Sequence, residues 1–227
     1  MTQSSHSAAR VMSDPRCKPF MPIPTCIANK TEQQRCMYAD DLIPEPMASI
    51  THAITIDAPP VEVWPWLIQM GAGRAGWYSW DSIDNGGVRS ARSILAEFQS
   101  VEIGQVFPAI PGADDVFVLH ALDSKRHLVL CVPSSSEGFL VSWEFTLESH
   151  DDNVTRLIVR GRIAENWLTD IGGQADATGG PILIERIYGT LAIIPQWIML
   201  PVAWFGHRIM EARMLRGIKR RVELTDQ

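Results

Sequence analysis

The sequence lacks the short motifs that identify several classes of enzyme. It contains no G-x-S-x-G, H-E-x-x-H or C-x-x-C, which argues against a serine-hydrolase elbow and against the common zinc sites. Among its 4 cysteines, Cys17, Cys26 and Cys36 are too widely spaced for a tight zinc-binding pair, and no histidine lies between them. We therefore expect free thiols in a reducing compartment, no metal and no cofactor.

Positive charge is in short supply. The chain has 20 Lys and Arg against 26 Asp and Glu, a net charge of −6, whereas a general nucleic-acid binder needs a broad basic surface. A signal peptide is not indicated either, because no apolar core follows a basic start. We expect a cytoplasmic protein without a nucleic-acid partner.

Regular periodicity is missing from the first part of the chain. Residues 1–38 scatter Pro, Ser, Cys and Met without helical or strand spacing, which predicts an irregular N-terminal arm. The remaining residues, 39–227, are enough for one domain with a sizeable core.

The clearest pattern begins at residue 50. Isoleucines alternate with threonines up to residue 56, and this period of two predicts a strand over 50–57. The carboxylate of Asp57 could then accept the free N–H groups of a helix predicted over 60–70. The apolar face of that helix would comprise Val61, Trp64 and Ile68.

A glycine motif follows this helix. Gly71, Gly73 and Gly76 spell the G-x-G-x-x-G of dinucleotide-binding folds. In such folds the motif follows a strand and opens a helix, whereas here a helix is predicted before it and no βαβ alternation comes after it. We interpret the glycines as a tight turn that folds Trp77 and Tyr78 back over the core.

From residue 104 to residue 163 the pattern predicts an antiparallel sheet. The candidate strands cover 104–107, 116–122, 127–132, 139–148 and 154–163. The last two form a hairpin in which outward glutamates face outward arginines, and such pairs favour one register. We expect a solvated face made by Glu144, Glu148, Arg156, Arg160 and Arg162.

The region 181–224 is the second informative element. Its twenty uncharged residues, 187–206, would be long enough for a membrane-spanning helix, but two prolines and several polar residues favour a helix buried against the domain. Residues 208–227 carry six basic and three acidic groups beside an apolar stripe that starts at Met210. We favour a terminal helix packed on the domain over a surface helix that contacts anionic lipid.

Four segments resemble a bacterial branch of the SRPBCC superfamily, which includes START-like lipid carriers and polyketide cyclases. They are I-T-I-D-A-P-P-V-E-V-W-P-W-L-I-Q-M-G at 54–71, G-R-A-G-W-Y-S-W-D at 73–81, V-E-I-G-Q-V-F at 101–107 and M-L-R-G-I-K-R-R at 214–221. The resemblance implies an α+β helix-grip fold, in which a curved antiparallel β-sheet wraps around a long C-terminal α-helix. It implies the fold more specifically than the activity, because many members of this branch have no assigned function.

The resemblance also implies a largely apolar cavity between the sheet and the helix. We expect this cavity to bind or carry a small hydrophobic molecule, lipid- or polyketide-like. The expected wall residues are Met70, Trp77, Tyr78, Phe117, Leu119, Trp143, Phe145, Tyr188, Trp197 and Trp204. His120 would add polarity, although a lone histidine on an apolar strand is more often a hydrogen-bonded core residue.

Catalysis is the alternative function. A cyclase or dehydratase would hold a polyketone and move protons with acid–base side chains in a water-poor cavity. The Tyr78 hydroxyl could donate to an oxyanion and Asp81 could accept a proton, with Arg74 holding that carboxylate. Asp84 would complete a carboxylate pair if burial separated the two pKa values. The same residues could instead be structural, and a third hypothesis is peripheral membrane contact through the basic C-terminal helix.

Overall fold

The computed structural model describes residues 26–109, 111, 116–167 and 196–225. In these ranges six strands form one antiparallel sheet, in the order β1-β6-β5-β4-β3-β2. The strands are β1 (Ala48–Ile56), β2 (Val106–Pro108), β3 (Val116–Asp123), β4 (His127–Pro133), β5 (Phe139–Asp151) and β6 (Val154–Ile163). The predicted sheet is confirmed, as is the hairpin of its last two strands.

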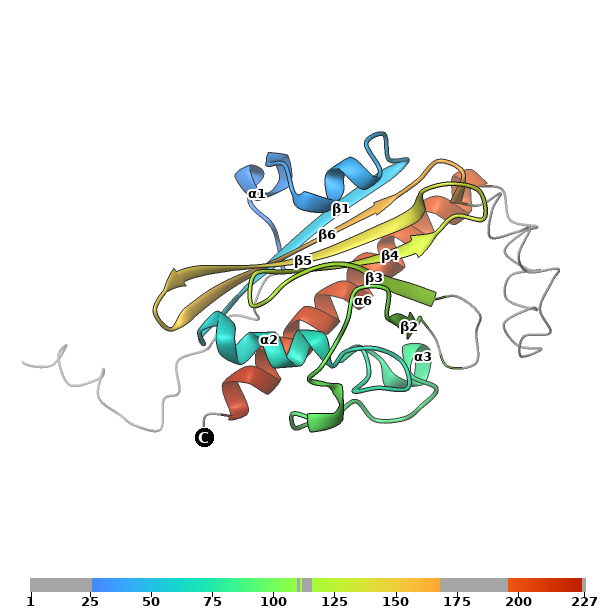
Figure 1. The fold of residues 1–227 in the computed structure, drawn as a ribbon. Coiled ribbons are helices and arrows are strands. Elements are labelled where there is room, and N and C mark those ends of the chain that lie inside the picture. Colours follow the sequence, from blue (N-terminus) through green and yellow to red (C-terminus); the bar gives the residue numbers. More distant parts are fainter. Residues whose placement is uncertain (1–25, 110, 112–115, 168–195, 226–227) are drawn as a thin grey trace, which may run out of the picture.

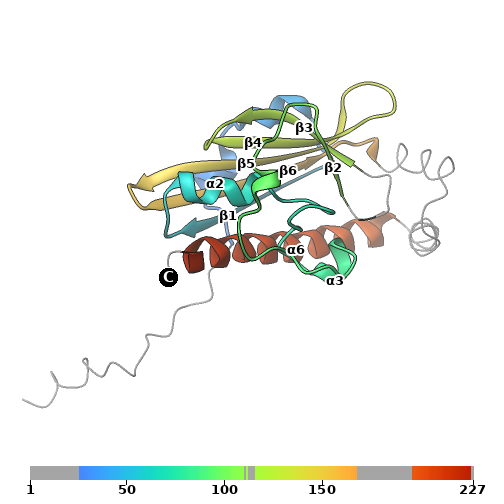
Figure 2. The same ribbon diagram turned by 60° about the horizontal axis from the view of Figure 1, so that its bottom comes forward.

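Helices cover both faces of this sheet. They are α1 (Lys30–Gln34), the 3-10 helix η1 (Tyr38–Leu42), α2 (Pro60–Ile68), α3 (Asp81–Asp84), the 3-10 helix η2 (Ala96–Phe98) and α6 (Gln196–Thr225). Figures 1 and 2 show α2 and α6 on one face, with α1 and η1 on the other. A C-terminal helix packed on a curved, open antiparallel sheet confirms the predicted α+β class.

Helix α6 packs on the sheet through the apolar stripe that the sequence predicts. Met214, Ile218 and Val222 are buried in the main core cluster, together with residues of β1, β5 and β6. The helix also passes unusually close to the chain after the glycine turn. A Cβ atom at Gly217 would lie 2.2 Å from the carbonyl oxygen of Tyr78, so only glycine permits this approach.

Helix α2 begins differently from the prediction. Its N-cap is Pro59, without a side-chain cap, and Pro60 occupies the first turn, where the N–H that proline lacks would have no partner. The prediction that Asp57 caps this helix was therefore wrong. The backbone N–H of Asp57 instead donates to Glu223 Oε1 of α6 at 2.9 Å. The apolar face is also shifted, because Val61 is exposed. The buried residues are Val63, Trp64, Trp66, Leu67 and Ile68.

The glycine motif forms the predicted tight turn. Gly71 and Gly76 exchange backbone hydrogen bonds of 3.2 and 3.0 Å, and both have positive φ, as Gly73 does. A Cβ atom at Gly76 would lie 2.3 Å from Ser90 Oγ, so this position also requires glycine for space. The turn returns Trp77 to the core, where it is buried.

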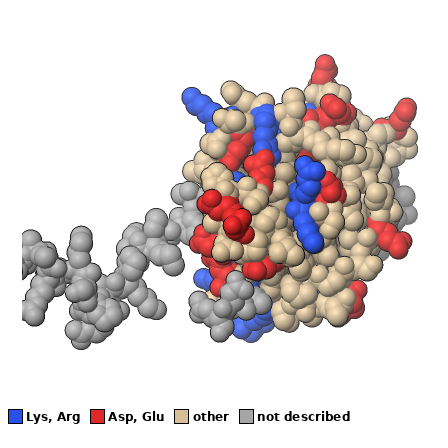
Figure 3. Space-filling model, turned by 60° about the vertical axis from the view of Figure 1, so that its left-hand side comes forward, with Lys and Arg blue, Asp and Glu red and all other residues tan. Residues whose placement is uncertain are grey.

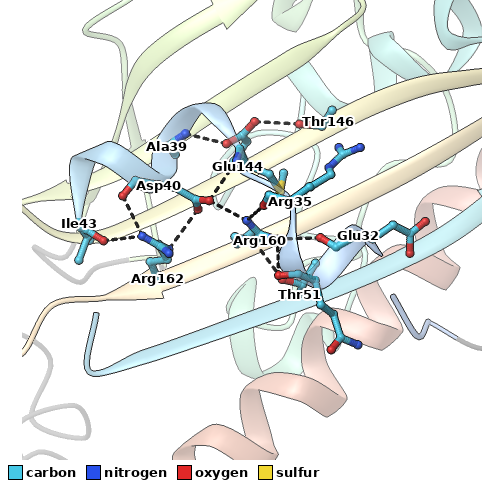
Figure 4. A network of polar contacts seen from close by, with 12 residues as sticks. Glu32, Arg35, Ala39, Asp40, Ile43, Thr51, Glu144, Thr146, Arg160 and Arg162 are labelled. Carbon is cyan, nitrogen blue, oxygen red and sulfur yellow. Dashed lines mark hydrogen bonds and ion pairs between the residues drawn. The ribbon is translucent and has the colours of Figure 1, made fainter. Parts of the chain in front are cut away.

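The charged side chains of β5 and β6 do not form a solvated face, and that prediction was wrong. The register is as expected, with Glu144 opposite Arg160, but both side chains are buried. The N-terminal segment 26–43 covers them (Figure 4). Glu144 Oε2 accepts the backbone N–H of Ala39 at 2.8 Å.

Arg160 joins this segment to β1 and uses every N–H group of its guanidinium to do so. It donates to Thr51 Oγ1, to Asp40 Oδ2 and to three backbone carbonyls, over distances of 2.7 to 3.0 Å. A guanidinium has five N–H donors, so each can be satisfied. The neighbouring arginines also pair with this segment: Arg156 contacts Glu32 at 2.7 Å, and Arg162 contacts Asp40 at 3.1 Å.

The outer surface carries mixed charge. On the face shown in Figure 3, Lys and Arg side chains lie among Asp and Glu side chains. Among the helices of the described ranges, none has the length and apolar character that crossing a bilayer requires. Of the uncharged run 187–206, residues 187–195 lie outside the described residues.

Candidate functional site

A pocket of about 460 Å³ lies between the sheet and the N-terminal half of α6. Its wall comes from the ends of the strands, from α6 and from the segment around α3. The lining residues are Ala48, Ile50, Trp77, Ser79, Ile83, Asp84, Ala109, Phe117, Val132, Val141, Trp143, Gly161, Ile163, Trp167, His207, Met210, Glu211 and Met214. Most of the wall is therefore apolar, which is typical of sites for small organic ligands.

One position of the pocket wall on β6, Gly161, has no side chain. Gly161 pairs with Trp143 of β5 and with Ile50 of β1, and all three line the pocket. A Cβ atom at Gly161 would meet Trp143 Cδ1 and His207 Nε2 only at 3.9 Å, which is ordinary contact. The glycine is therefore not required by crowding. It leaves open the space that a larger inward residue would fill.

Three aromatic rings form one side of the pocket. The Trp143 ring centroid lies 5.6 Å from that of Trp77 and 5.5 Å from that of Phe117. Both indole N–H groups have partners: Trp77 donates to Ala109 O at 2.9 Å, and Trp143 donates to Glu211 Oε1 at 2.8 Å. These bonds fix the rings in place.

Next to this aromatic side of the pocket, the buried carboxylate of Glu211 on α6 lies close to two histidines, His52 of β1 and His207 of α6. Glu211 Oε2 is hydrogen-bonded to His52 Nδ1, and both side chains are almost completely buried. Nε2 of His207, one helical turn earlier on α6, lies 3.8 Å from the same oxygen. His207 is half exposed and lines the pocket. The hydrogen bond to Glu211 orients the buried His52 ring, whereas His207 lies within ion-pair but not hydrogen-bond distance of the same carboxylate.

Asp84 is the second carboxyl group of the pocket wall. Asp84 is 6% exposed, and its Oδ1 atom is buried without a hydrogen-bond partner among the described residues. Burial, with a smaller contribution from the Asp81 carboxylate, raises the pKa of Asp84 to about 6. Asp84 therefore changes charge near neutral pH. Because it is part of the pocket wall, it could accept a proton from a bound ligand or donate one to it.

The pocket includes only some of the predicted wall residues. Trp77, Phe117 and Trp143 line it. Met70, Leu119 and Phe145 are buried in the core instead, and Trp204 is partly exposed beneath the Arg208 guanidinium. His120 packs against Phe139. Tyr188 lies outside the described residues, as does the side chain of Trp197.

The three catalytic candidates are not assembled in the way the sequence suggested. Arg74 donates to the backbone carbonyls of Ile68 and Met70 at 2.8 and 3.1 Å, so it does not hold Asp81. The Asp81 carboxylate accepts the hydroxyl of Ser90.

Tyr78 is also engaged away from the pocket wall. Its hydroxyl donates to Trp66 O at 3.1 Å and accepts from Gln69 Nε2 at 2.9 Å. Burial raises the pKa of the Tyr78 phenol well above its usual range, which keeps it protonated as a donor. A catalytic role for this residue stays an untested prediction.

Four residues in or next to the pocket were not identified from the sequence, although the position of each in the sequence pattern was informative. They are His52, Gly161, His207 and Glu211. Gly161 interrupts β6, a strand whose other residues all carry large or β-branched side chains, and a glycine in a strand often marks a close approach of a ligand. His52 shares the inward face of β1 with Ile50. His207 and Glu211 are four residues apart, so they lie on one face of α6. None of these signals shows that the residues meet, because the contact joins segments more than 150 residues apart.

The fold and the pocket define the class of protein: an α+β protein with a ligand-sized cavity between an antiparallel sheet and a C-terminal helix. No family model matches the chain, and no curated protein matches it.

Solved structures similar to this chain include a polyketide cyclase-like protein from Corynebacterium glutamicum, with 16% identity over 79% of this chain and 93% of that chain and a TM-score of 0.40. A protein from Mesorhizobium loti has 13% identity over 79% of this chain and 100% of that chain, with a TM-score of 0.38. CalU16 from Micromonospora echinospora has 15% identity over 78% and 84%, with a TM-score of 0.32. At these identities and scores, none of the three bears on the site.

Proposed function

We propose that this protein binds or carries a small, mainly apolar molecule, lipid- or polyketide-like, in the pocket between the sheet and α6. The observation that supports the proposal is the cavity of about 460 Å³ with its wall of three aromatic rings. Pockets of a few hundred Å³ with apolar walls and few polar groups are the usual form of small-molecule sites. Gly161 lines this cavity at a position where a Cβ atom would make only ordinary contacts, so a larger side chain there would take up part of its space.

Native mass spectrometry of the purified full chain tests this proposal. The expected result is a mass above that of the chain, which an organic extraction removes and which chromatography identifies as an apolar compound. If the protein carries nothing, titration with apolar aromatic compounds should still quench the fluorescence of the tryptophans in the wall. A protein that carries nothing and responds to no such compound would contradict the proposal.

Proton transfer on the bound molecule is the second candidate function. It is favoured by two acid–base groups on one wall, Asp84 and the His207 imidazole beside Glu211. The pKa of about 6 at Asp84 lies near the pH at which acid–base catalysis works best. A cyclase or dehydratase of polyketide-like substrates would use such groups.

A general-base probe tests this candidate without knowledge of the substrate. In 5-nitrobenzisoxazole, a base takes the ring C–H proton, the N–O bond breaks, and a coloured phenolate forms. We expect the protein to accelerate this reaction and His207→Ala to lower the rate about tenfold or more, within the range of general-base contributions. The exposed His150 provides the control His150→Ala, which should react normally. Equal rates for the protein, His207→Ala and buffer would exclude an accessible base.

A further inference from the structure

We propose that the pocket selects a ligand that carries a hydrogen-bond donor on its apolar body, an amine above all, and that Asp84 receives this donor. The inference deepens the proposed function and rests on it, since it names the chemical class of the bound molecule. It follows from the polar groups of the wall, which are mainly acceptors.

The first observation is the unsatisfied oxygen of Asp84. A buried carboxyl oxygen without a partner costs free energy, and Asp84 Oδ1 is buried with no partner among the described residues. The Ser79 hydroxyl and the backbone N–H groups of Trp80 and Asp84 already stabilise the charged form of this carboxyl, but Oδ1 has no partner among the described residues. Asp84 belongs to the pocket wall, so we infer that a ligand donor bonds to this oxygen. A ligand that supplies an N–H or O–H would remove the cost on binding.

The second observation is the charge of the wall. Its ionisable side chains, within the described residues, are Asp84, Glu211 and His207, and no Lys or Arg is among them. The Ser79 hydroxyl has two acceptors within the protein, Met210 O at 3.2 Å and the Asp84 carboxyl, so its hydrogen is not available to a ligand. Among the described residues of the wall, His207 is the one with a basic side chain, and it lies 3.8 Å from Glu211.

This distribution disfavours an anionic ligand. A carboxylate or phosphate would enter an apolar site beside two carboxyl groups, without an Arg or Lys on the wall to offset its desolvation. A cation meets the opposite situation. The faces of Trp77, Phe117 and Trp143 carry the negative side of the ring quadrupole, and Asp84 is ionised above its pKa of about 6.

Three probes with the same ring system test the inference. They are 1-naphthylmethylamine, 1-naphthalenemethanol and 1-naphthaleneacetate (the carboxylate). At about pH 8, above the pKa of Asp84, these are cationic, neutral and anionic, respectively. Calorimetric titration of the full chain should give the tightest binding for the amine. We expect about a tenfold or greater advantage of the amine over the alcohol, the range for a hydrogen bond to a charged group, and the weakest binding for the acid.

Two variants assign the effect to a residue. Asp84→Asn should remove most of the advantage of the amine over the alcohol, while Asp123→Asn, an exposed carboxylate on β3, should keep it. An advantage that persists in Asp84→Asn would overturn the role of Asp84. If Asp84→Asn does not fold, titration of the wild type near pH 5, below the pKa of Asp84, should show a reduced amine advantage, and an unchanged one would overturn it.

The outcomes separate this inference from the proposed function. If the alcohol binds and the acid binds as well as the amine or better, the donor selection is wrong while the pocket still binds apolar molecules. If no probe binds and no compound is extracted from the protein, the proposed function fails and the inference fails with it.

Discussion

At the scale of single residues, Asp84 works against the stability of the fold. Its pKa of about 6 lies above the ordinary value of 3.8, so the folded state holds the proton more tightly than the unfolded state. Stability is therefore highest below the ordinary value and falls as pH rises from about 4 to 6. Above that range the folded chain bears the full cost of a buried carboxylate.

Asp84→Asn should accordingly stabilise the protein at about pH 8, by about 1–3 kcal/mol, since each pKa unit corresponds to about 1.4 kcal/mol. At about pH 4 the gain should largely disappear, because the wild-type carboxyl is then protonated in the folded state. Thermal unfolding at the two pH values measures the difference. A variant that is equally or less stable than wild type at pH 8 would show that the ionised carboxylate is well compensated.

Tyr78→Phe should affect the fold rather than the site. The hydroxyl of Tyr78 is bonded to Trp66 O and Gln69 Nε2, and its removal leaves buried polar groups without a partner. We expect a loss of about 1–3 kcal/mol in the free energy of unfolding and unchanged affinity for 1-naphthalenemethanol. Lost binding with unchanged stability would instead support the catalytic role suggested by the sequence.

The sequence could identify the aromatic side of the site and one of its polar groups, Asp84, but not the contact of Glu211 with His52 and His207. Trp77, Phe117 and Trp143 were predictable because a fold with an inner face of large aromatics brings them together. The contact between His52 and Glu211 crosses the core, because the two residues meet only when α6 is laid over β1. Tyr78 and Arg74 are hydrogen-bonded to the end of α2 and the residues that follow it, and their catalytic role stays a prediction.

At the scale of elements, α6 depends on one close crossing. Alanine normally stabilises a helix interior by about 1 kcal/mol relative to glycine. At Gly217 a Cβ atom would lie 2.2 Å from the backbone oxygen of Tyr78, so Gly217→Ala should instead destabilise the protein by about 1–3 kcal/mol.

Gly206, in the same helix, provides the matched control, because a Cβ atom there meets nothing within 4 Å. Gly206→Ala should raise the free energy of unfolding by up to about 1 kcal/mol, and urea denaturation compares the two variants. Equal effects of both substitutions would mean that α6 can shift away from Tyr78 without cost.

The sequence predicts helices and strands correctly where the apolar pattern is long, and less correctly at their first and last residues. The inward stripe of α6 and the register of β5 with β6 follow from apolar spacing and turn chemistry alone. The start of α2 was misplaced because two adjacent prolines can begin a helix without a side-chain cap. Asp57 instead lies near Lys219 of α6, at 3.4 Å, a contact that no local pattern contains.

At the scale of the whole molecule, the N-terminal segment 26–43 completes the sheet by covering its outer face. Arg160 donates four hydrogen bonds to this layer, and Arg156 and Arg162 donate others. Charged residues at alternate positions of a strand ordinarily indicate a solvated face, so the sequence predicted the strands but not their cover. The cover depends on acids and backbone carbonyls more than 100 residues earlier in the chain.

Arg160→Ala should therefore destabilise the protein by about 3–5 kcal/mol, the range for removing one partner of a buried ion pair. Limited proteolysis should also cut segment 26–43 sooner than in wild type. Arg126→Ala removes an exposed arginine with an ion pair to Asp123 at 3.3 Å and should change neither result appreciably. If Arg160→Ala matches Arg126→Ala, the segment is held by its apolar contacts.

The central claim is that the space beside Gly161 receives a ligand, and calorimetric titration with 1-naphthalenemethanol tests it most directly. Gly161→Val places a branched side chain in that space between Trp143 and His207. Ser49→Val adds the same side chain at an exposed position of β1. We predict that wild type and Ser49→Val bind the alcohol alike, and that Gly161→Val keeps its thermal stability but binds about tenfold more weakly or worse, a loss of about 1.4 kcal/mol. Equal affinity in all three proteins, or no binding to any of them, would contradict the claim.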